Sequence, residues 1–235
     1  MTSPQALSSL SIPPILVATD LSAGARTALM VGRGRSLLTG APLVIVHVIP
    51  DESWGSRRDG SAPDGATTSM AGHRLREQVR ACTALADHQY RLHLAHGPPS
   101  AAVLSLARKL GAGLVIVGHA SDGTATRVTL GRMTEQLGRH TPMSLLAVRS
   151  AQPQGCIVTN VPLDDGSSAA RAVAREAAMR DAPLVPCLDE DPVRVAVREQ
   201  ASLIVIDGRH DDPVDVLRRA RCSVLVLRVR GARRS

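Results

Sequence analysis

The chain has 235 residues, a mean hydropathy of +0.03 and a formal net charge of +7. This length suffices for two modest α/β domains, and no window approaches the roughly 18 apolar residues that a membrane span needs. With Trp54 and Tyr90 as the aromatic residues, the sequence lacks the stacking platforms that bind single-stranded nucleic acid, so nucleic acid is a disfavoured partner despite the basic charge.

The N-terminus and the cysteines indicate a cytoplasmic protein. Residues 1–11 lack a basic region followed by an apolar core, which a secretory signal would need. Cysteines that are widely spaced and free of Cys-x-x-Cys or His-Cys clusters read as reduced structural thiols: Cys82, Cys156, Cys187 and Cys222. We therefore expect no disulfide framework and no metal site.

The first part of the chain alternates apolar runs with helical stretches. Runs that are apolar at nearly every position are typical of parallel strands covered on both faces. The predicted strands are 15–19, 43–49, 90–95, 114–117 and 144–149, and the predicted helices are 22–38, 69–86, 101–110 and 131–140. Residues 51–68 are rich in Gly, Ser, Asp and Pro and are predicted to form a long surface loop.

After a short linker at 152–155, the chain repeats the same unit in shorter form. Ile15-Leu16-Val17-Ala18 is echoed by Cys156-Ile157-Val158, Leu114–Val117 by Leu203–Ile206, and Ser144–Arg149 by Ser223–Arg228. The second copy is predicted to contain strands at 156–160, 183–187, 203–206 and 223–229 and helices at 167–180 and 191–200. It lacks the long loop, one helix and the third strand.

The predicted fold class is therefore α/β, with two doubly wound parallel-sheet domains in tandem over 12–150 and 155–230. The expected strand order is 3-2-1-4-5, in which the third strand is an edge, so the second domain can lose it without breaking the remaining sheet.

Two segments could carry chemistry. Asp20 ends the first strand, and the segment from Gly118 to Arg132 follows the fourth; in open α/β sheets these two ends flank the switch point where ligands bind. Asp20 could accept hydrogen bonds from a ribose or base, or it could simply cap the following turn. Small residues and a helix starting near Gly131 would suit an anion.

At these positions the chain resembles the universal stress protein family, as a tandem member with a shortened second domain. The resemblance rests on Ile-Leu-Val-Ala-Thr-Asp-Leu-Ser at strand one, His47-Val48-Ile49-Pro50 at strand two, Val-Ile-Val-Gly-His at strand four and Leu-Leu-Ala-Val-Arg at strand five. It implies ATP, with Mg²⁺, as a cofactor of the first domain. The nucleotide-binding candidates that it implies are Thr19, Asp20, Val48, Gly118, His119, Ser121, Arg127, Gly131 and Arg132.

The match to the nucleotide-binding pattern is partial. The 13-residue spacing from Gly118 to Gly131 is kept, but Ser121 replaces a glycine and Arg132 replaces a Ser or Thr. Arg132 and Arg127 beside a helix N-terminus could mark an anion site, and Arg132 could equally point to solvent. In the second copy the Asp20 position is lost and Asp207, Asp211, Asp212 and Asp215 crowd the loop, so we expect no nucleotide there.

The sequence thus predicts a regulatory binding protein that is not an enzyme, and it leaves alternatives open. In the leading hypothesis, the first domain senses ATP or a related nucleotide. In the second, the protein is a partner-interaction module without nucleotide, and in the third it is a weak nucleotide hydrolase. The resemblance further implies that the two fifth strands, 145–149 and 224–227, pair within the chain. A protein partner is expected but not identifiable, and no membrane partner is expected.

Overall fold

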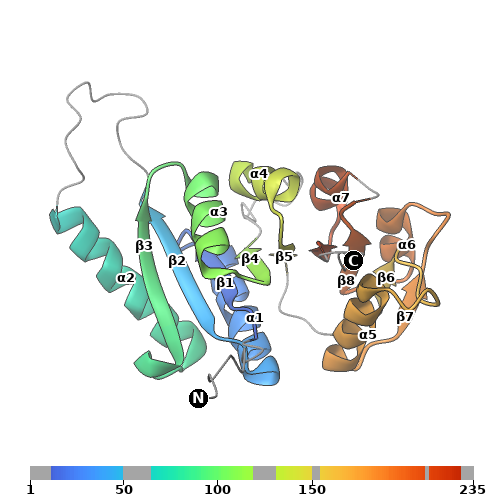
Figure 1. Ribbon diagram of the computed structural model, residues 1–235, viewed down its shortest axis with the longest axis horizontal. Coiled ribbons are helices and arrows are strands. Elements are labelled where there is room, and N and C mark those ends of the chain that lie inside the picture. Colours follow the sequence, from blue (N-terminus) through green and yellow to red (C-terminus); the bar gives the residue numbers. More distant parts are fainter. Residues whose placement is uncertain (1–11, 50–64, 119–130, 150–153, 210–211, 229–235) are drawn as a thin grey trace, which may run out of the picture.

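The computed structural model describes residues 12–49, 65–118, 131–149, 154–209 and 212–228, which form an α/β fold around one nine-stranded sheet (Figure 1). The elements of the first half are β1 (Ile15–Thr19), α1 (Ala23–Thr39), β2 (Leu43–Ile49), α2 (Gly65–Thr83), the short 3₁₀ helix η2 (Asp87–Gln89), β3 (Tyr90–His96), α3 (Pro99–Leu110), β4 (Leu114–Gly118), α4 (Arg132–His140) and β5 (Ser144–Val148). Those of the second half are β6 (Ile157–Thr159), α5 (Ser168–Arg180), β7 (Leu184–Pro186), α6 (Pro192–Arg198), β8 (Leu203–Asp207), α7 (Pro213–Arg219) and β9 (Ser223–Leu227).

The strand order confirms the predicted topology of the first half. The sheet runs β3-β2-β1-β4-β5-β9-β8-β6-β7, and all neighbouring pairs are parallel except β5 with β9. The first half thus has the expected order 3-2-1-4-5. In the second half, β7, β6, β8 and β9 follow the same order as β2, β1, β4 and β5 in the first half. No described strand of the second half corresponds to the edge strand β3.

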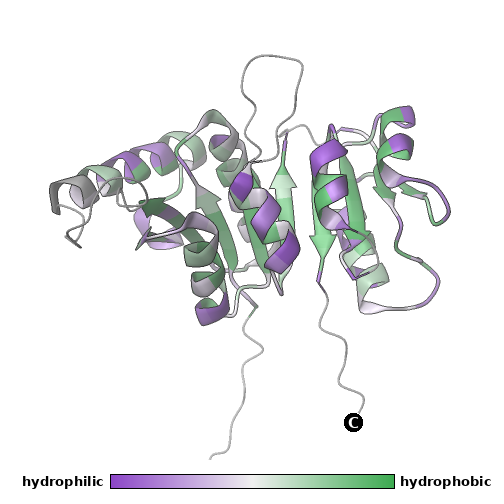
Figure 2. Cartoon of the chain, turned by 90° about the horizontal axis from the view of Figure 1, so that it is seen from above, coloured by the Kyte–Doolittle hydropathy of each residue, from purple (hydrophilic) through white to green (hydrophobic). Residues whose placement is uncertain are grey.

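Helices cover both faces of the sheet and create two hydrophobic cores. One core joins the sheet to α3, α4, α6 and α7, and the other joins it to α1, α2 and α5. Neighbouring residues of β1 point to opposite cores: Leu16 contributes to the first and Val17 to the second, and both are fully buried. Figure 2 shows the corresponding pattern, with apolar strands between helices whose outer surfaces are polar.

Helices α2 and α7 differ most from the sequence-based expectation, and the other boundaries shift by at most two residues. Helix α2 begins at Gly65, inside the stretch predicted as a loop, and ends at Thr83 rather than 86. Helix α7 was not predicted. Its Asp212-Pro213 start is a strong signal, because Asp caps a helix and proline suits its first turn; the acidic residues around it were instead interpreted as a loop.

The two halves meet at β5 and β9, the segments expected to pair. The antiparallel register joins Leu145 to Val226 and Ala147 to Val224, and these side chains are almost fully buried. Because β5 and β9 would each be a sheet edge in an isolated half, their pairing removes two exposed edges.

The contacts beside this pairing are exchanged symmetrically. The amide of Arg149 donates to Ser223 Oγ and that of Arg228 donates to Ser144 Oγ, both at 3.2 Å. Their guanidinium groups donate to the carbonyls of Leu217 in α7 (3.1 Å) and Gly138 in α4 (3.3 Å). Burial lowers the pKa of Arg149 to about 10. This reciprocity is the pattern of a two-fold dimer interface, built here within one chain.

On the opposite face of the sheet, an ion-pair cluster joins the halves. Glu176 of α5 accepts from Arg35 of α1 through both carboxylate oxygens, one of them at 2.6 Å, and Arg180 lies 3.7 Å away. The side chains of Arg35 and Glu176 are only 11% and 8% exposed. A charge pair so far removed from water fixes the relative position of the two helices.

Candidate functional site

The carboxyl ends of β1, β2 and β4 lie together at one edge of the sheet. The parallel register places Thr19 beside His47 and Ala18 beside Val117, so the residues that follow these strands meet at the point where the strand order reverses. This is the switch point at which ligands bind to doubly wound sheets. The candidate residues Asp20, Val48 and Gly118 are all brought to this edge.

Thr19 is a structural residue at this point. Its hydroxyl is buried, donates to Gln78 Oε1 of α2 at 2.8 Å and accepts from the amide of Leu21 at 3.0 Å. Gln78 in turn donates to the carbonyl of Ser22 at 3.4 Å. Both polar functions of Thr19 are thus occupied by the fold, and its role is to hold the loop that carries Asp20.

Asp20 shapes the loop and remains exposed. One carboxylate oxygen accepts from the amide of Ser22 at 2.9 Å, and Ser22 caps α1 by accepting from Ala25 at 3.2 Å. Between them Leu21 adopts a left-handed conformation with φ of +68°. The two readings of Asp20 are therefore compatible: it caps the turn and still presents a carboxylate to solvent.

The end of β2 adds an apolar residue and a histidine that the sequence analysis had not singled out. Val48 is 9% exposed and belongs to the core beneath α3, so only its edge can reach the switch point. His47 Nδ1 lies 2.9 Å from the carbonyl of Thr19 and ties β2 to the end of β1. Its position near the end of a predicted strand next to the first strand is the sequence feature that could have indicated this contact.

Gly118 is required by packing. A Cβ on this residue would overlap the Gly24 carbonyl and lie 2.7 Å from the amide nitrogen of Ala25, because the first turn of α1 sits directly on the end of β4. The glycine is thus explained without a phosphate, whatever else its position allows.

Gly131 has a different environment. It stands before the first residue of α4, in an extended conformation, and a Cβ there would meet no atom of the described residues within 4 Å. Among the described residues, no side chain caps the amide groups of the first turn of this helix. Arg132 follows, exposed and without an ion pair to any described carboxylate. His119, Ser121 and Arg127 lie outside the described residues.

The equivalent place in the second half is occupied by the protein's own side chains. Asp207 stands where the first half has Gly118, and its carboxylate accepts from Arg209 at 2.6 Å and 3.0 Å. These hydrogen bonds raise the pKa of Arg209. Asn160, at the end of β6, accepts from the Asp207 amide at 3.3 Å, and Val161, at the position of Asp20, is buried.

The described acids of this loop in the second half have partners within the protein. Asp212 caps α7 by accepting from the amide of Val214 at 3.0 Å, and Asp215 pairs with Arg219 at 2.7 Å. Asp207 pairs with Arg209, and Asp211 lies outside the described residues. The helix N-terminus corresponding to α4 is already occupied by a carboxylate.

Two classes of site have no support in the described part of the chain. No group of three or more His, Cys, Asp or Glu side chains there could hold a metal ion. None of the helices described is both long and apolar enough to cross a bilayer.

Comparison with known proteins gives a family match and related folds. Residues 12–149 match the model of the universal stress protein family. A universal stress protein from Archaeoglobus fulgidus DSM 4304 has a TM-score of 0.67 at 12% identity, covering 92% of this chain and 98% of that one. A putative universal stress protein from Pseudomonas aeruginosa UCBPP-PA14 has a TM-score of 0.61 at 18% identity, with 92% and 93% covered. No curated protein sequence matches. At these identities the structural likeness shows the fold, and it extends over both halves.

Proposed function

Because the chain belongs to the universal stress protein family, we propose that it is a regulatory protein whose first half, residues 12–150, binds a nucleotide at the carboxyl ends of β1, β2 and β4. The second half, residues 155–230, serves as a permanent pairing partner and binds no nucleotide. The expected ligand is ATP with Mg²⁺ or a related nucleotide.

The observation that carries this proposal is the difference between the helix N-termini at the two switch points. The N-terminus of α4 follows Gly131, where the described residues leave space and provide no side-chain cap, whereas α7 is capped by Asp212. A helix N-terminus carries about half a positive charge, so the uncapped one favours a phosphate and the capped one is already neutralised.

The other residues fit the remaining parts of a nucleotide. The exposed carboxylate of Asp20 can accept hydrogen bonds from ribose hydroxyl groups, and Val48 offers an apolar edge to a base. Arg132, exposed at the first position of α4, can pair with a phosphate through a bidentate contact. The described residues provide no cluster for the metal, so Mg²⁺ would be carried by the phosphates.

We propose binding rather than hydrolysis. A hydrolase would need a group positioned to activate water, and the two described candidates at the switch point have structural contacts: Asp20 accepts from the Ser22 amide and His47 Nδ1 contacts the Thr19 carbonyl. A steady release of phosphate that depended on Asp20 would establish the hydrolase instead.

The partner module without nucleotide is the second candidate. It is favoured by Gly118, whose lack of a side chain is fully explained by the contact with α1. We propose a cytoplasmic location for either activity, since none of the four cysteines forms a disulfide.

Isothermal titration of the full chain with ATP and Mg²⁺ tests the proposal. We expect one binding event per chain, weakened at least about tenfold, or 1.4 kcal/mol, by Asp20→Ala and by Gly131→Asp, which would place a carboxylate at the phosphate position. Asp164→Ala, which removes an exposed carboxylate of the second half, is the matched control and should leave binding unchanged. Absence of heat with ATP and related nucleotides would favour the partner module.

A further inference from the structure

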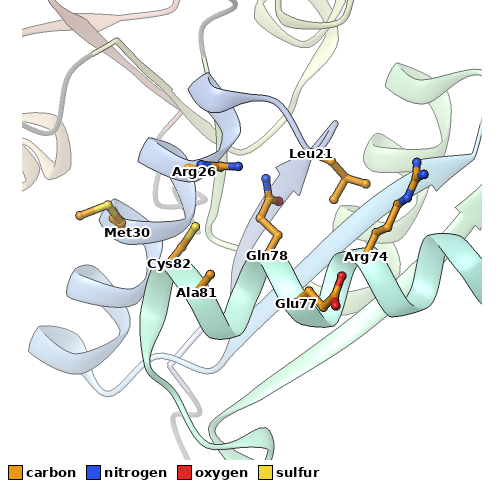
Figure 3. A pocket seen from close by; sticks show the side chains of 8 residues that line it. All are labelled: Leu21, Arg26, Met30, Arg74, Glu77, Gln78, Ala81 and Cys82. Atoms are coloured by element: carbon orange, nitrogen blue, oxygen red, sulfur yellow. The ribbon is translucent and has the colours of Figure 1, made fainter.

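A groove between α1 and α2 lies on the outer surface of the first half and begins beside the switch point, at Leu21 and Gln78. Its larger hollow, of about 710 Å³, is lined by Leu21, Arg26, Met30, Arg74, Glu77, Gln78, Ala81 and Cys82 (Figure 3). A second hollow of about 320 Å³ lies near the C-terminal end of α1, with Arg33 and Leu37 of α1 and Leu85, which follows α2, among its lining residues. We call these two hollows together the α1–α2 groove.

The wall formed by α1 has the spacing of a helical stripe. Arg26, Met30, Arg33 and Leu37 follow one another at intervals of four, three and four residues, so they lie along one side of the helix. Met30 is 51% and Leu37 58% exposed, which is unusual for large apolar side chains seven residues apart. The stripe spans about 16 Å, the length of a three-turn helix.

The charge of the groove is predominantly positive. Arg26 and Arg33 of α1 and Arg74 of α2 line it, against the single acid Glu77, which pairs with the exposed His73 at 3.2 Å when that histidine is protonated. Neither Arg26 nor Arg74 forms an ion pair with a described carboxylate, and the Nε of Arg33 has no hydrogen-bond partner among the described residues.

The floor of the groove is held in place by the fold. Gln78 is 9% exposed, and its amide bonds to Thr19 and to the Ser22 carbonyl, so it cannot swing out to close the hollow. Burial raises the pKa of the Cys82 thiol, so this residue presents a neutral, apolar surface. The floor is therefore preformed and largely apolar beneath basic walls.

The openness of the groove selects the kind of occupant. Five of the eight residues lining the larger hollow are exposed, namely Arg26, Met30, Arg74, Glu77 and Ala81. A small molecule would keep much of its surface in water there, whereas binding sites for small molecules normally enclose most of the ligand. A groove between two helices suits a third helix, whose side chains at positions i, i+4 and i+7 enter it.

We propose that the α1–α2 groove is the docking site for an amphipathic helix of a protein partner, with an apolar face and flanking acidic residues. The apolar face contacts Met30, Leu37 and the floor, and the acidic residues pair with Arg26, Arg33 and Arg74. This site adjoins the proposed nucleotide site at Leu21 and Gln78, but the proposal does not depend on nucleotide binding.

The test uses the full chain and two labelled synthetic helical peptides of about 14 residues, followed by fluorescence anisotropy. One peptide has Leu at positions i, i+4 and i+7 with Glu on both flanks, and the other has Lys in place of every Glu. We expect the acidic peptide to bind at least tenfold more tightly than the basic one, with an affinity that falls as salt is added.

Charge reversal locates the site. Arg26→Glu with Arg74→Glu should reverse the preference between the two peptides, while Arg91→Glu with Arg194→Glu, an equal change of charge at exposed positions outside the groove, should leave it unchanged. Met30→Ala should weaken binding of the acidic peptide several-fold, whereas Val197→Ala, at a residue 54% exposed on α6, should not. Circular dichroism melting curves establish that each variant is folded, and each should still bind ATP as the unaltered chain does.

The proposal is overturned if neither peptide binds, if both bind equally, or if the preference survives reversal of Arg26 and Arg74. Sedimentation of the full chain without peptide tests the other possible occupant of the groove, a second copy of this chain. A concentration-dependent dimer that Arg26→Glu with Arg74→Glu abolishes would assign the groove to a second copy of this chain instead of a partner helix.

Discussion

The two halves of this molecule use the same arrangement of strands, but they treat the ends of those strands differently. In the first half, the carboxyl ends of β1 and β4 are followed by an exposed Asp20 and by a helix without a side-chain cap. In the second half, Asp207 pairs with Arg209 and Asp212 caps α7. The second half satisfies the polar groups at the ends of its strands with its own side chains. The first half leaves the carboxylate of Asp20 exposed and the first amide groups of α4 without a cap from the described side chains.

This difference shows how the same arrangement of strands can either leave space for a ligand or be stabilised by its own side chains. Uncapped amides at a helix N-terminus cost roughly 1 kcal/mol of stability, and a ligand can recover that energy. A half that binds no ligand cannot recover this energy from one, so a capped helix is its more stable arrangement. If the proposed function is correct, the second half is stabilised by Asp212 at the position where the first half binds its ligand.

The largest effect is expected from separating the halves. Val226 is fully buried in β9, which lies between β5 and β8, so Val226→Pro removes a ladder hydrogen bond and introduces a clash in the middle of the sheet. We expect a loss of about 5 kcal/mol or more, or failure to fold, with both halves affected in urea unfolding followed by circular dichroism.

Val226→Ala is the matched control, since it keeps the backbone amide and should cost only about 1 to 2 kcal/mol. If the proline variant retained the full unfolding transition of the first half, the second half would not be its structural support.

A smaller loss is expected at the ion-pair cluster between the halves. Glu176→Ala leaves the buried Arg35 and Arg180 without their carboxylate, which should cost about 3 kcal/mol in the free energy of unfolding. Glu190→Ala breaks an exposed ion pair with Arg198 and should barely change stability. Equal effects of the two variants would show that the cluster does not fix the interface.

The two glycines at the first switch point should separate packing from binding. Gly118→Ala places a methyl group against the backbone of α1 and should cost about 1 to 3 kcal/mol, whereas Gly131→Ala meets open space. Thermal unfolding measures both. A Gly118→Ala protein as stable as the unaltered chain would contradict the packing role of this residue.

The smallest effect concerns the cap of α6 in the second half, and it is expected to depend on pH. Asp191 caps α6 through the amide of Val193 and pairs with Arg219. Burial alone would raise its pKa, but the bonds to Arg219 and to Val193 outweigh burial and hold it below the ordinary value of 3.8. The charged carboxylate therefore stabilises the fold above that value, and the contribution is lost as the pH falls through the lower folded-state pKa.

We expect the unfolding free energies of the unaltered chain and of Asp191→Asn to differ by at most about 1 kcal/mol at neutral pH and to converge below pH 3.8. Urea titrations at pH 7, 5 and 3 measure the difference. A difference that grew toward acid pH would reverse the sign argued here.

Strand order and the location of the first switch point could be predicted from the sequence, because they rest on local patterns. Runs such as Leu114–Val117 are apolar throughout, and Asp20 directly follows such a run. The sequence-based predictions failed where one local pattern is compatible with two structures. The Asp-rich stretch before Cys222 was interpreted as a repulsive loop, yet Asp212 and Pro213 begin a helix whose acids are all used at short range.

By itself, the sequence determined the α/β class and the strand order of the first half, since apolar runs and their spacing survive in any environment. Only the tertiary structure showed that Gly118 is a packing glycine, that Asp207 is neutralised by Arg209, and that Glu176 pairs with Arg35 of the other half beside Arg180 of its own helix. These facts depend on contacts between residues far apart in the chain or on the direction of a side chain, and neither is encoded in a local pattern.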